Sequence, residues 1–109
     1  MAIKANLSID QGTDFSTTID VTDDNGTVVD LTGYTGAAQM RKHYTSSAQT
    51  AFTVTVSPLM GEVQLAMNAA TTAALTAGRY VYDCELTSSA NVVSRLVEGI
   101  VTVSPQVTR

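Results

Sequence analysis

The chain has 109 residues, with six Lys and Arg against ten Asp and Glu, a formal net charge of −4 and a single Cys. This length suits one domain with one core, and we expect residues 1–109 to form it. So few cations disfavour nucleic-acid binding, because neutralising phosphates needs clustered Lys and Arg, and one Cys excludes an internal disulfide.

The N-terminal region predicts two strands and no targeting segment. Polar residues follow Ile3 at once, so we expect no signal peptide, and no apolar run approaches the length of a membrane span. We therefore expect synthesis in a cytoplasm and no membrane contact. The first predicted strand runs from about Ile3 to Ile9. The second runs from Asp14 to Asp23, with Phe15 and Ile19 on one face.

The Asp24-Asn25-Gly26 segment predicts a hairpin. A two-residue Asn25-Gly26 turn would pair Val21 with Asp30 and place a carboxylate on the core face, which is costly. A three-residue loop with a left-handed Gly26 and an adjoining bulge keeps that face apolar. In that register, which we expect, Val21 lies opposite Val29 and Ile19 lies opposite Leu31.

The middle of the chain predicts a strand, a second hairpin and a short helix. A strand from about Thr35 to Tyr44 points Ala38 and Met40 inward. Apolar residues alternate on both sides of a four-residue turn, Pro58 to Gly61. A hairpin with this turn places them opposite one another on one face. That register pairs Val56 with Val63, Val54 with Leu65 and Phe52 with Met67. Asn68 is the expected N-cap of one short helical turn near residues 68–75, which crosses between sheets.

The last third predicts the two longest strands. From Arg79 to Thr87, one face carries Tyr80, Tyr82, Cys84 and Leu86. The return strand, Val92 to Val103, loses its alternation at Leu96-Val97 and contains Gly99, so we expect a bulge near Glu98-Gly99. Gly78-x-Tyr80 matches the corner of immunoglobulin-like domains, where a Tyr hydroxyl binds back to the backbone.

These elements predict an all-β fold, an immunoglobulin-like antiparallel β-sandwich of about seven to eight strands. Five residues are expected to have structural roles, at turns, at the corner and beside the bulge. They are Gly26, Gly78, Tyr80, Tyr82 and Gly99.

No motif specifies an activity, a metal site or a cofactor, and we expect none of them. The nearest approach to a catalytic constellation is Asp83 and Glu85 with Glu98 on the neighbouring strand. An acidic solvent-facing surface balanced by Arg79 and Arg95 explains these side chains better. Cys84 alternates with buried positions and is expected to act as a small hydrophobe, not as a nucleophile.

Three segments together resemble small virion proteins of tailed bacteriophages. They are the run DNGTVVDLTG at 24–33, the spacing Leu75-x-x-Gly78-x-Tyr80-x-Tyr82-Asp83-x-x-Leu86, and the run RLVEGIVTVSP at 95–105. The likeness is to the β-sandwich modules of baseplate, tail and head-associated proteins, including the N-terminal domain of upper baseplate proteins. The resemblance implies a virion location, a homo-oligomer and a second virion protein as partner.

Three functions from different classes remain open at this stage. The first is a non-enzymatic virion structural protein that self-associates and binds another virion protein through sheet edges and the loops at one end. Its first interface residues are expected in the terminal segments, at Ile3, Ala5, Leu7, Val103, Pro105 and Val107. The second is a module that binds host-surface carbohydrate through Tyr44, the Thr45 to Thr50 loop and the Ser88 to Asn91 tip. The third is a hydrolase that uses Asp83, Glu85 and Glu98.

Overall fold

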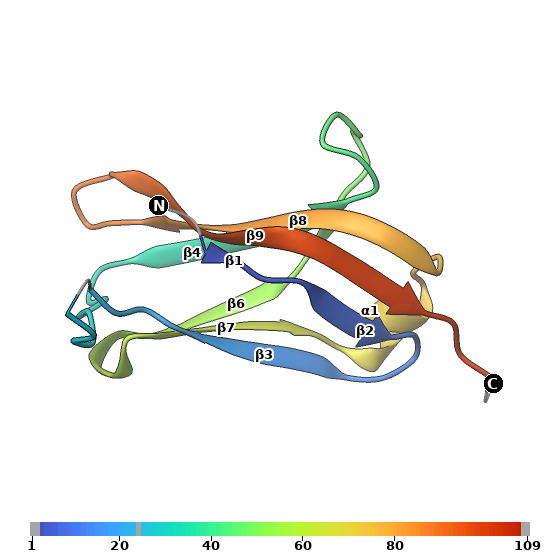
Figure 1. The fold of residues 1–109 in the computed structure, drawn as a ribbon, viewed down its shortest axis with the longest axis horizontal. Helices are drawn as coiled ribbons and strands as arrows, with labels where there is room; N and C mark the ends of the chain where they lie inside the picture. The colour runs from blue at the N-terminus through green and yellow to red at the C-terminus, as the bar shows by residue number, and fades with distance from the viewer. Residues whose placement is uncertain (1–2, 24, 108–109) are drawn as a thin grey trace.

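The structure, a computed structural model, describes residues 3–23 and 25–107 and folds them into two β-sheets packed face to face (Figure 1). The larger sheet has the order β1-β9-β8-β4-β5, with β2 also paired to β9, and the smaller has the order β3-β7-β6. The larger sheet contains β1 (Ile3–Lys4), β2 (Leu7–Asp10), β4 (Thr35–Arg41), β5 (Thr50–Ala51), β8 (Gly78–Thr87) and β9 (Val93–Ser104). The smaller contains β3 (Phe15–Asp20), β6 (Thr53–Ser57) and β7 (Glu62–Met67). The predicted all-β sandwich is confirmed, with nine strands in the described residues.

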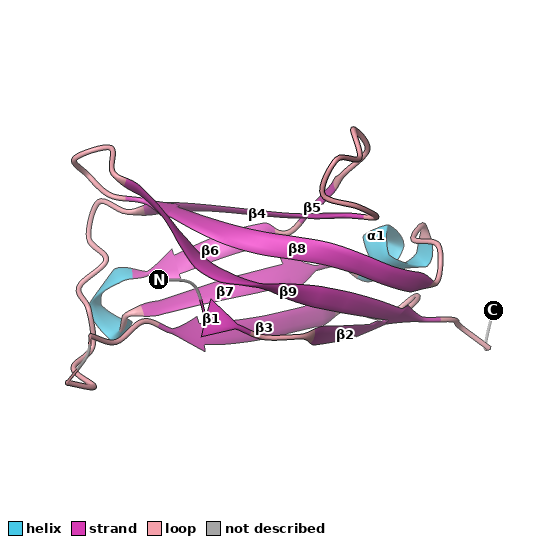
Figure 2. Cartoon of the chain, turned by 45° about the horizontal axis from the view of Figure 1, so that its top comes forward, coloured by secondary structure: helices cyan, strands magenta, loops and turns pink. Residues whose placement is uncertain are grey.

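The two sheets lie one over the other (Figure 2), and their inward-facing side chains form a single core. Ile9, Met40, Leu65 and Val101 are almost fully buried there. The ring of Phe52 lies 6.1 Å from that of Tyr82, at an edge-on angle, and the ring of Phe15 packs beside it. Alternation along each strand therefore places the apolar residues between the sheets.

The N-terminal segment differs from the single antiparallel strand that we expected. It is divided into β1 and β2, and both run parallel to β9, with Ile3 paired to Val97 and Leu7 to Val101. At the division, the Ala5 N–H donates to the Glu98 carbonyl at 2.9 Å. The Asn6 side-chain oxygen accepts a hydrogen bond from the Ile100 N–H at 3.1 Å. A side chain thus replaces one backbone acceptor where the strand bends away.

The predicted bulge near Glu98-Gly99 is wrong in position. The register changes between Cys84 paired to Val97 and Glu85 paired to Arg95, so Leu96 is the extra residue. Gly99 pairs regularly with Tyr82. A Cβ at Gly99 would collide with the carbonyl group of Ala5, which shows that the absent side chain makes room for the N-terminal segment.

The first hairpin has the predicted register at its tip. Thr22 bridges Val28, the Val29 N–H donates to the Val21 carbonyl at 3.0 Å, and Gly26 has a φ of 80°. The loop residue Asp24 lies outside the described residues. The expected pairing of Ile19 with Leu31 is wrong, because β3 ends at Asp20 and Ile19 pairs with Val63 of β7.

The second hairpin confirms the pairs Val56–Val63 and Val54–Leu65. Its turn is a short 3₁₀ helix, η1 (Pro58–Met60), closed by Gly61 at a φ of 61°. The third expected pair is wrong, because the Phe52 N–H donates to the Ala38 carbonyl of β4 at 3.0 Å and Met67 pairs with Phe15. The chain crosses between the sheets at Phe52, so its backbone leaves the ladder while its ring stays in the core.

The crossing from β7 to β8 is the helix α1 (Ala69–Ala73), as predicted. The Asn68 side chain caps it by accepting from the Thr71 N–H at 2.9 Å. At the start of β8, the Tyr80 hydroxyl donates to the Thr76 carbonyl at 2.6 Å, four residues back, and Gly78 has a φ of 135°. This is the backbone tie of a tyrosine corner, and it fixes the entry of β8 into the sheet.

Candidate functional site

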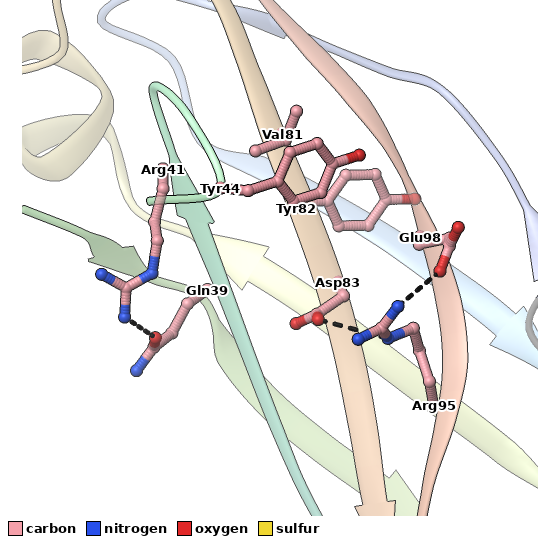
Figure 3. A pocket seen from close by; sticks show the side chains of 8 residues that line it. All are labelled: Gln39, Arg41, Tyr44, Val81, Tyr82, Asp83, Arg95 and Glu98. Atoms are coloured by element: carbon pink, nitrogen blue, oxygen red, sulfur yellow. Dashed lines mark hydrogen bonds and ion pairs between the residues drawn. The ribbon is translucent and has the colours of Figure 1, made fainter. Parts of the chain in front are cut away.

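A pocket of about 250 Å³ lies on the outer face of the larger sheet, between β4, β8 and β9 and the loop that joins β4 to β5 (Figure 3). Its lining is polar on the sheet side and aromatic at the rim. The lining residues are Gln39, Arg41, Tyr44, Val81, Tyr82, Asp83, Arg95 and Glu98.

One wall of the pocket is an ion-pair network centred on Arg95. Its guanidinium lies 3.4 Å from the Asp83 carboxylate and 2.9 Å from the Glu98 carboxylate, and Lys4 lies 3.9 Å from Glu98. In a regular strand Arg95 and Glu98 would face opposite sides; the extra residue Leu96 brings them to the same face. The hydrogen bond with Glu98, followed by the charges of Asp83 and Glu98, raises the pKa of Arg95.

This network changes the interpretation of the three acidic residues that sequence reasoning grouped together. Asp83 and Glu98 are cross-strand neighbours and share Arg95, whereas Glu85 does not line the pocket. The two carboxylates are thus paired with one guanidinium at the pocket wall. Arg95, which was expected to balance the acidic side chains, forms ion pairs with Asp83 and Glu98.

The opposite wall is organised by Arg41, the last residue of β4. Its guanidinium donates to the carbonyls of Ser46 at 2.6 Å and Ser47 at 3.3 Å, and to the side-chain oxygen of Gln39 at 3.1 Å. These bonds hold the loop of residues 42–49 above the sheet. Tyr44 projects from that loop at the pocket rim and is 83% exposed.

The two other ionisable groups that could take part in chemistry are locked in the core. Burial, followed by the charges of Asp83 and Glu85, raises the pKa of the Cys84 thiol to about 11. Burial also raises the pKa of Tyr82 to about 12, and its hydroxyl donates to the Ala5 carbonyl at 2.7 Å. Cys84 is thus a protonated, packed side chain, since a nucleophile needs the thiolate.

The expected surface around Tyr44 and the Ser88–Asn91 tip is not formed. Arg41 pairs with Val81 at one end of the β4–β8 ladder, and Thr35 pairs with Thr87 at the other end. The Tyr44 loop follows Arg41 and the Ser88–Asn91 tip follows Thr87, at opposite ends of this ladder. About six residue spacings, or roughly 20 Å of strand, therefore separate the loop from the tip. Of the residues expected to form that surface, Tyr44 is the one that lines the pocket.

The terminal residues expected at an interface divide into two groups. Val103 is buried in the core, whereas Ala5 and Leu7 are partly buried where they pack against the core. Ile3, Pro105 and Val107 are exposed. Thr108 and Arg109, the end of the expected C-terminal interface segment, lie outside the described residues.

Sequence reasoning expected docking through the loops at one end of the sandwich but did not identify the apolar residues exposed there. Leu59 and Met60 of η1 are 83% and 63% exposed, and Val28 of the first hairpin is 53% exposed. The hairpin and η1 are held together, because the Val21 N–H donates to the Gly61 carbonyl at 2.7 Å and the Leu31 N–H to the Pro58 carbonyl at 3.0 Å. We call Val28, Leu59 and Met60 the loop-end surface. The sequence signal was present: a Pro-x-x-Gly turn that carries two large apolar residues.

Two absences among the described residues concern metal binding and membrane-spanning helices. In residues 3–23 and 25–107, no group of three or more His, Cys, Asp or Glu side chains is placed to hold a metal ion. Over the same residues, no helix is both long and apolar enough to cross a membrane.

Comparison with known proteins supports the fold and leaves the function open. No family model matches the chain, and no curated protein matches it. Among solved structures, it is similar to an internalin-like protein of Listeria monocytogenes, with a TM-score of 0.53 and 14% identity. The match covers 94% of this chain but 28% of that protein. At this identity the likeness shows a shared β-sandwich fold alone.

Proposed function

We propose that the chain is a non-enzymatic structural module of a tailed-phage particle. It serves as an adaptor or decoration component of the tail, baseplate, neck or head. It self-associates and docks onto another virion protein. The proposal is supported by the resemblance of segments 24–33, 75–86 and 95–105 to virion sandwich modules.

The observation that carries the docking part is the loop-end surface. Val28, Leu59 and Met60 are each more than half exposed, although burying such side chains is worth about 1.5–3 kcal/mol each. Grouped exposed apolar side chains mark protein interaction sites more often than scattered ones do. The β8–β9 tip, which carries exposed Val92 and Val93, lies at the same end (Figure 1). This end of the sandwich is thus the surface offered to a neighbouring protein.

The test is incorporation of the chain into particles. A phage lacking the gene is complemented with the parent chain, with Leu59→Asp, or with Thr18→Asp as an exposed control on the smaller sheet. Quantitative mass spectrometry of purified particles should find the parent and the control, and at least tenfold less of Leu59→Asp. Equal incorporation of all three would show that the loop-end surface does not dock.

A second function, carbohydrate binding, is favoured by the pocket beside Tyr44. An exposed aromatic ring in the same pocket as Gln39 and the charged groups of Asp83, Arg95 and Glu98 offers stacking and hydrogen bonds together. A glycan array tests this function. Selective binding that is lost in Tyr44→Ala supports it, and binding to no glycan removes it.

A further inference from the structure

Strand β6 is an open edge of the smaller sheet. It pairs with β7 on one side and is outermost in the order β3-β7-β6. Within the described residues, no backbone hydrogen bond from outside the ladder reaches residues 53–57. The outer N–H and C=O groups of the strand are therefore available to a further strand.

The edge formed by β1 and β2 and the edge formed by β3 carry charged residues, and β6 does not. Lys4 and Asp10 lie on the β1 and β2 edge, and Asp14 and Asp20 lie at the two ends of β3. By contrast, residues 50–61 contain no charged residue, and β6 has neither Pro nor a bulge. Charges, prolines and bulges are the features that keep edge strands from pairing, so β6 is an unprotected edge.

The sequence of β6 is nearly symmetric about its centre. It is Thr53-Val54-Thr55-Val56-Ser57, with Val54 and Val56 half-buried against the core and Thr53 and Thr55 exposed. An antiparallel copy centred on Thr55 places Val54 opposite Val56 and Thr53 opposite Ser57. Valines then face valines on the inner side and hydroxyls face hydroxyls on the outer side, which is the pairing that strand alternation requires.

We propose that β6 of one copy pairs antiparallel with β6 of a second copy, across a twofold axis at Thr55. The two three-stranded sheets then form one six-stranded sheet, and the interface is isologous. This inference rests on the proposal that the chain self-associates, and it names the strand responsible. Pro58 and the crossing at Phe52 limit the pairing to five residues per copy, so association in solution is weak and is strengthened where many copies are assembled together.

The test places a charge on the twofold axis. Light scattering after size exclusion, at concentrations up to about 1 mM, should show the parent mass rising toward two chains. Thr55→Lys brings two ammonium groups together across the axis and should weaken association by about tenfold or more. Thr18→Lys is the matched control, since Thr18 is the same residue type on the same sheet face, in the opposite edge strand.

A charge exchange makes the test specific to the symmetric axis. Thr55→Glu alone should also weaken association, but mixing it with Thr55→Lys sets opposite charges across the axis and should restore it. Thr55→Cys should form an interchain disulfide under mild oxidation and Thr18→Cys should not, because directly opposed residues lie within disulfide reach. The buried Cys84 does not compete. This cross-link also decides the question if the charged variants do not fold.

The outcomes separate this inference from the proposed function. A parent chain that stays at one chain mass throughout, or a Thr55→Cys chain that does not cross-link, overturns β6 pairing. If Thr55→Lys self-associates as well as the parent chain does, β6 pairing is also overturned. Self-association through another surface then remains in place. Incorporation into particles is measured independently and remains the test of the virion role.

Discussion

The replacement Gly99→Ala tests how the N-terminal segment is held. An added Cβ would collide with the Ala5 carbonyl group, so residues 3–6 must shift. Three hydrogen bonds depend on their position: Ala5 N–H to Glu98, Ile100 N–H to Asn6, and the Tyr82 hydroxyl to Ala5. At about 0.5–1.5 kcal/mol each, their loss costs about 1.5–4.5 kcal/mol. The lower backbone entropy of unfolded Ala offsets about 0.4–1 kcal/mol, which leaves a net loss of about 0.5–4 kcal/mol.

Urea unfolding measures this loss, and a deletion of residues 1–6 identifies its cause. In the deleted chain there is no Ala5 carbonyl to meet, so Gly99→Ala should cost almost nothing there, and the two changes should be strongly non-additive. Amide hydrogen exchange of the full-length variant should show faster exchange at Ala5 and Ile100. A Gly99→Ala chain as stable as the parent, or an equal cost in the deleted chain, would refute the reasoning.

Three further changes test the corner, the core and the ion-pair network. Tyr80→Phe removes the bond to Thr76 and should lower the free energy of unfolding by about 1 kcal/mol, while Tyr44→Phe at an exposed position should not; equal midpoints in urea would contradict the corner. Because the pKa of Cys84 is raised from 9.0 to about 11, the folded chain keeps a proton that the unfolded chain releases. The stabilisation that comes from keeping the Cys84 thiol protonated is therefore complete below pH 9 and is lost as the pH rises through 11. Cys84→Ala should flatten that decline, and an unchanged slope would exclude Cys84 as its source. Arg95→Gln should destabilise slightly and less at high salt, since its partners are partly exposed; a large, salt-independent loss would show that the network is shielded from solvent.

Local patterns predicted local structure well. The register at Val21 and Val29 followed from keeping Asp30 off the core face, and the structure has that register. The Pro58 to Gly61 turn and the Asn68 cap were likewise encoded within a few residues. Each of these features is decided by contacts between residues close in the sequence.

The misses came from contacts between distant residues. The parallel pairing of the N-terminal segment with β9 joins residues about 94 positions apart, and no local pattern distinguishes it from antiparallel pairing. Gly99 within a strand pattern predicts a bulge, whereas in the structure it leaves space for Ala5. The same limit applies to Phe52, whose alternation fits β6 although its backbone bonds to Ala38.

The candidate site was predicted in its parts and not as a whole. The sequence placed Asp83 and Glu98 on one face of neighbouring strands, as the structure has them. It also named Arg95 as a balancing charge, and the bulge at Leu96 is what brings Arg95 to the face of these acids; Arg79, named with it, does not line the pocket. The residues of the loop-end surface were missed because η1 and the first hairpin meet through tertiary contacts.

The copy number of the chain in purified particles of a phage that encodes it tests the central claim most directly. Targeted mass spectrometry should find a fixed number of copies per particle, comparable to that of tail or neck proteins, as a symmetric assembly requires. Detection of the chain in the infected-cell lysate, with none in the particles, would contradict the account.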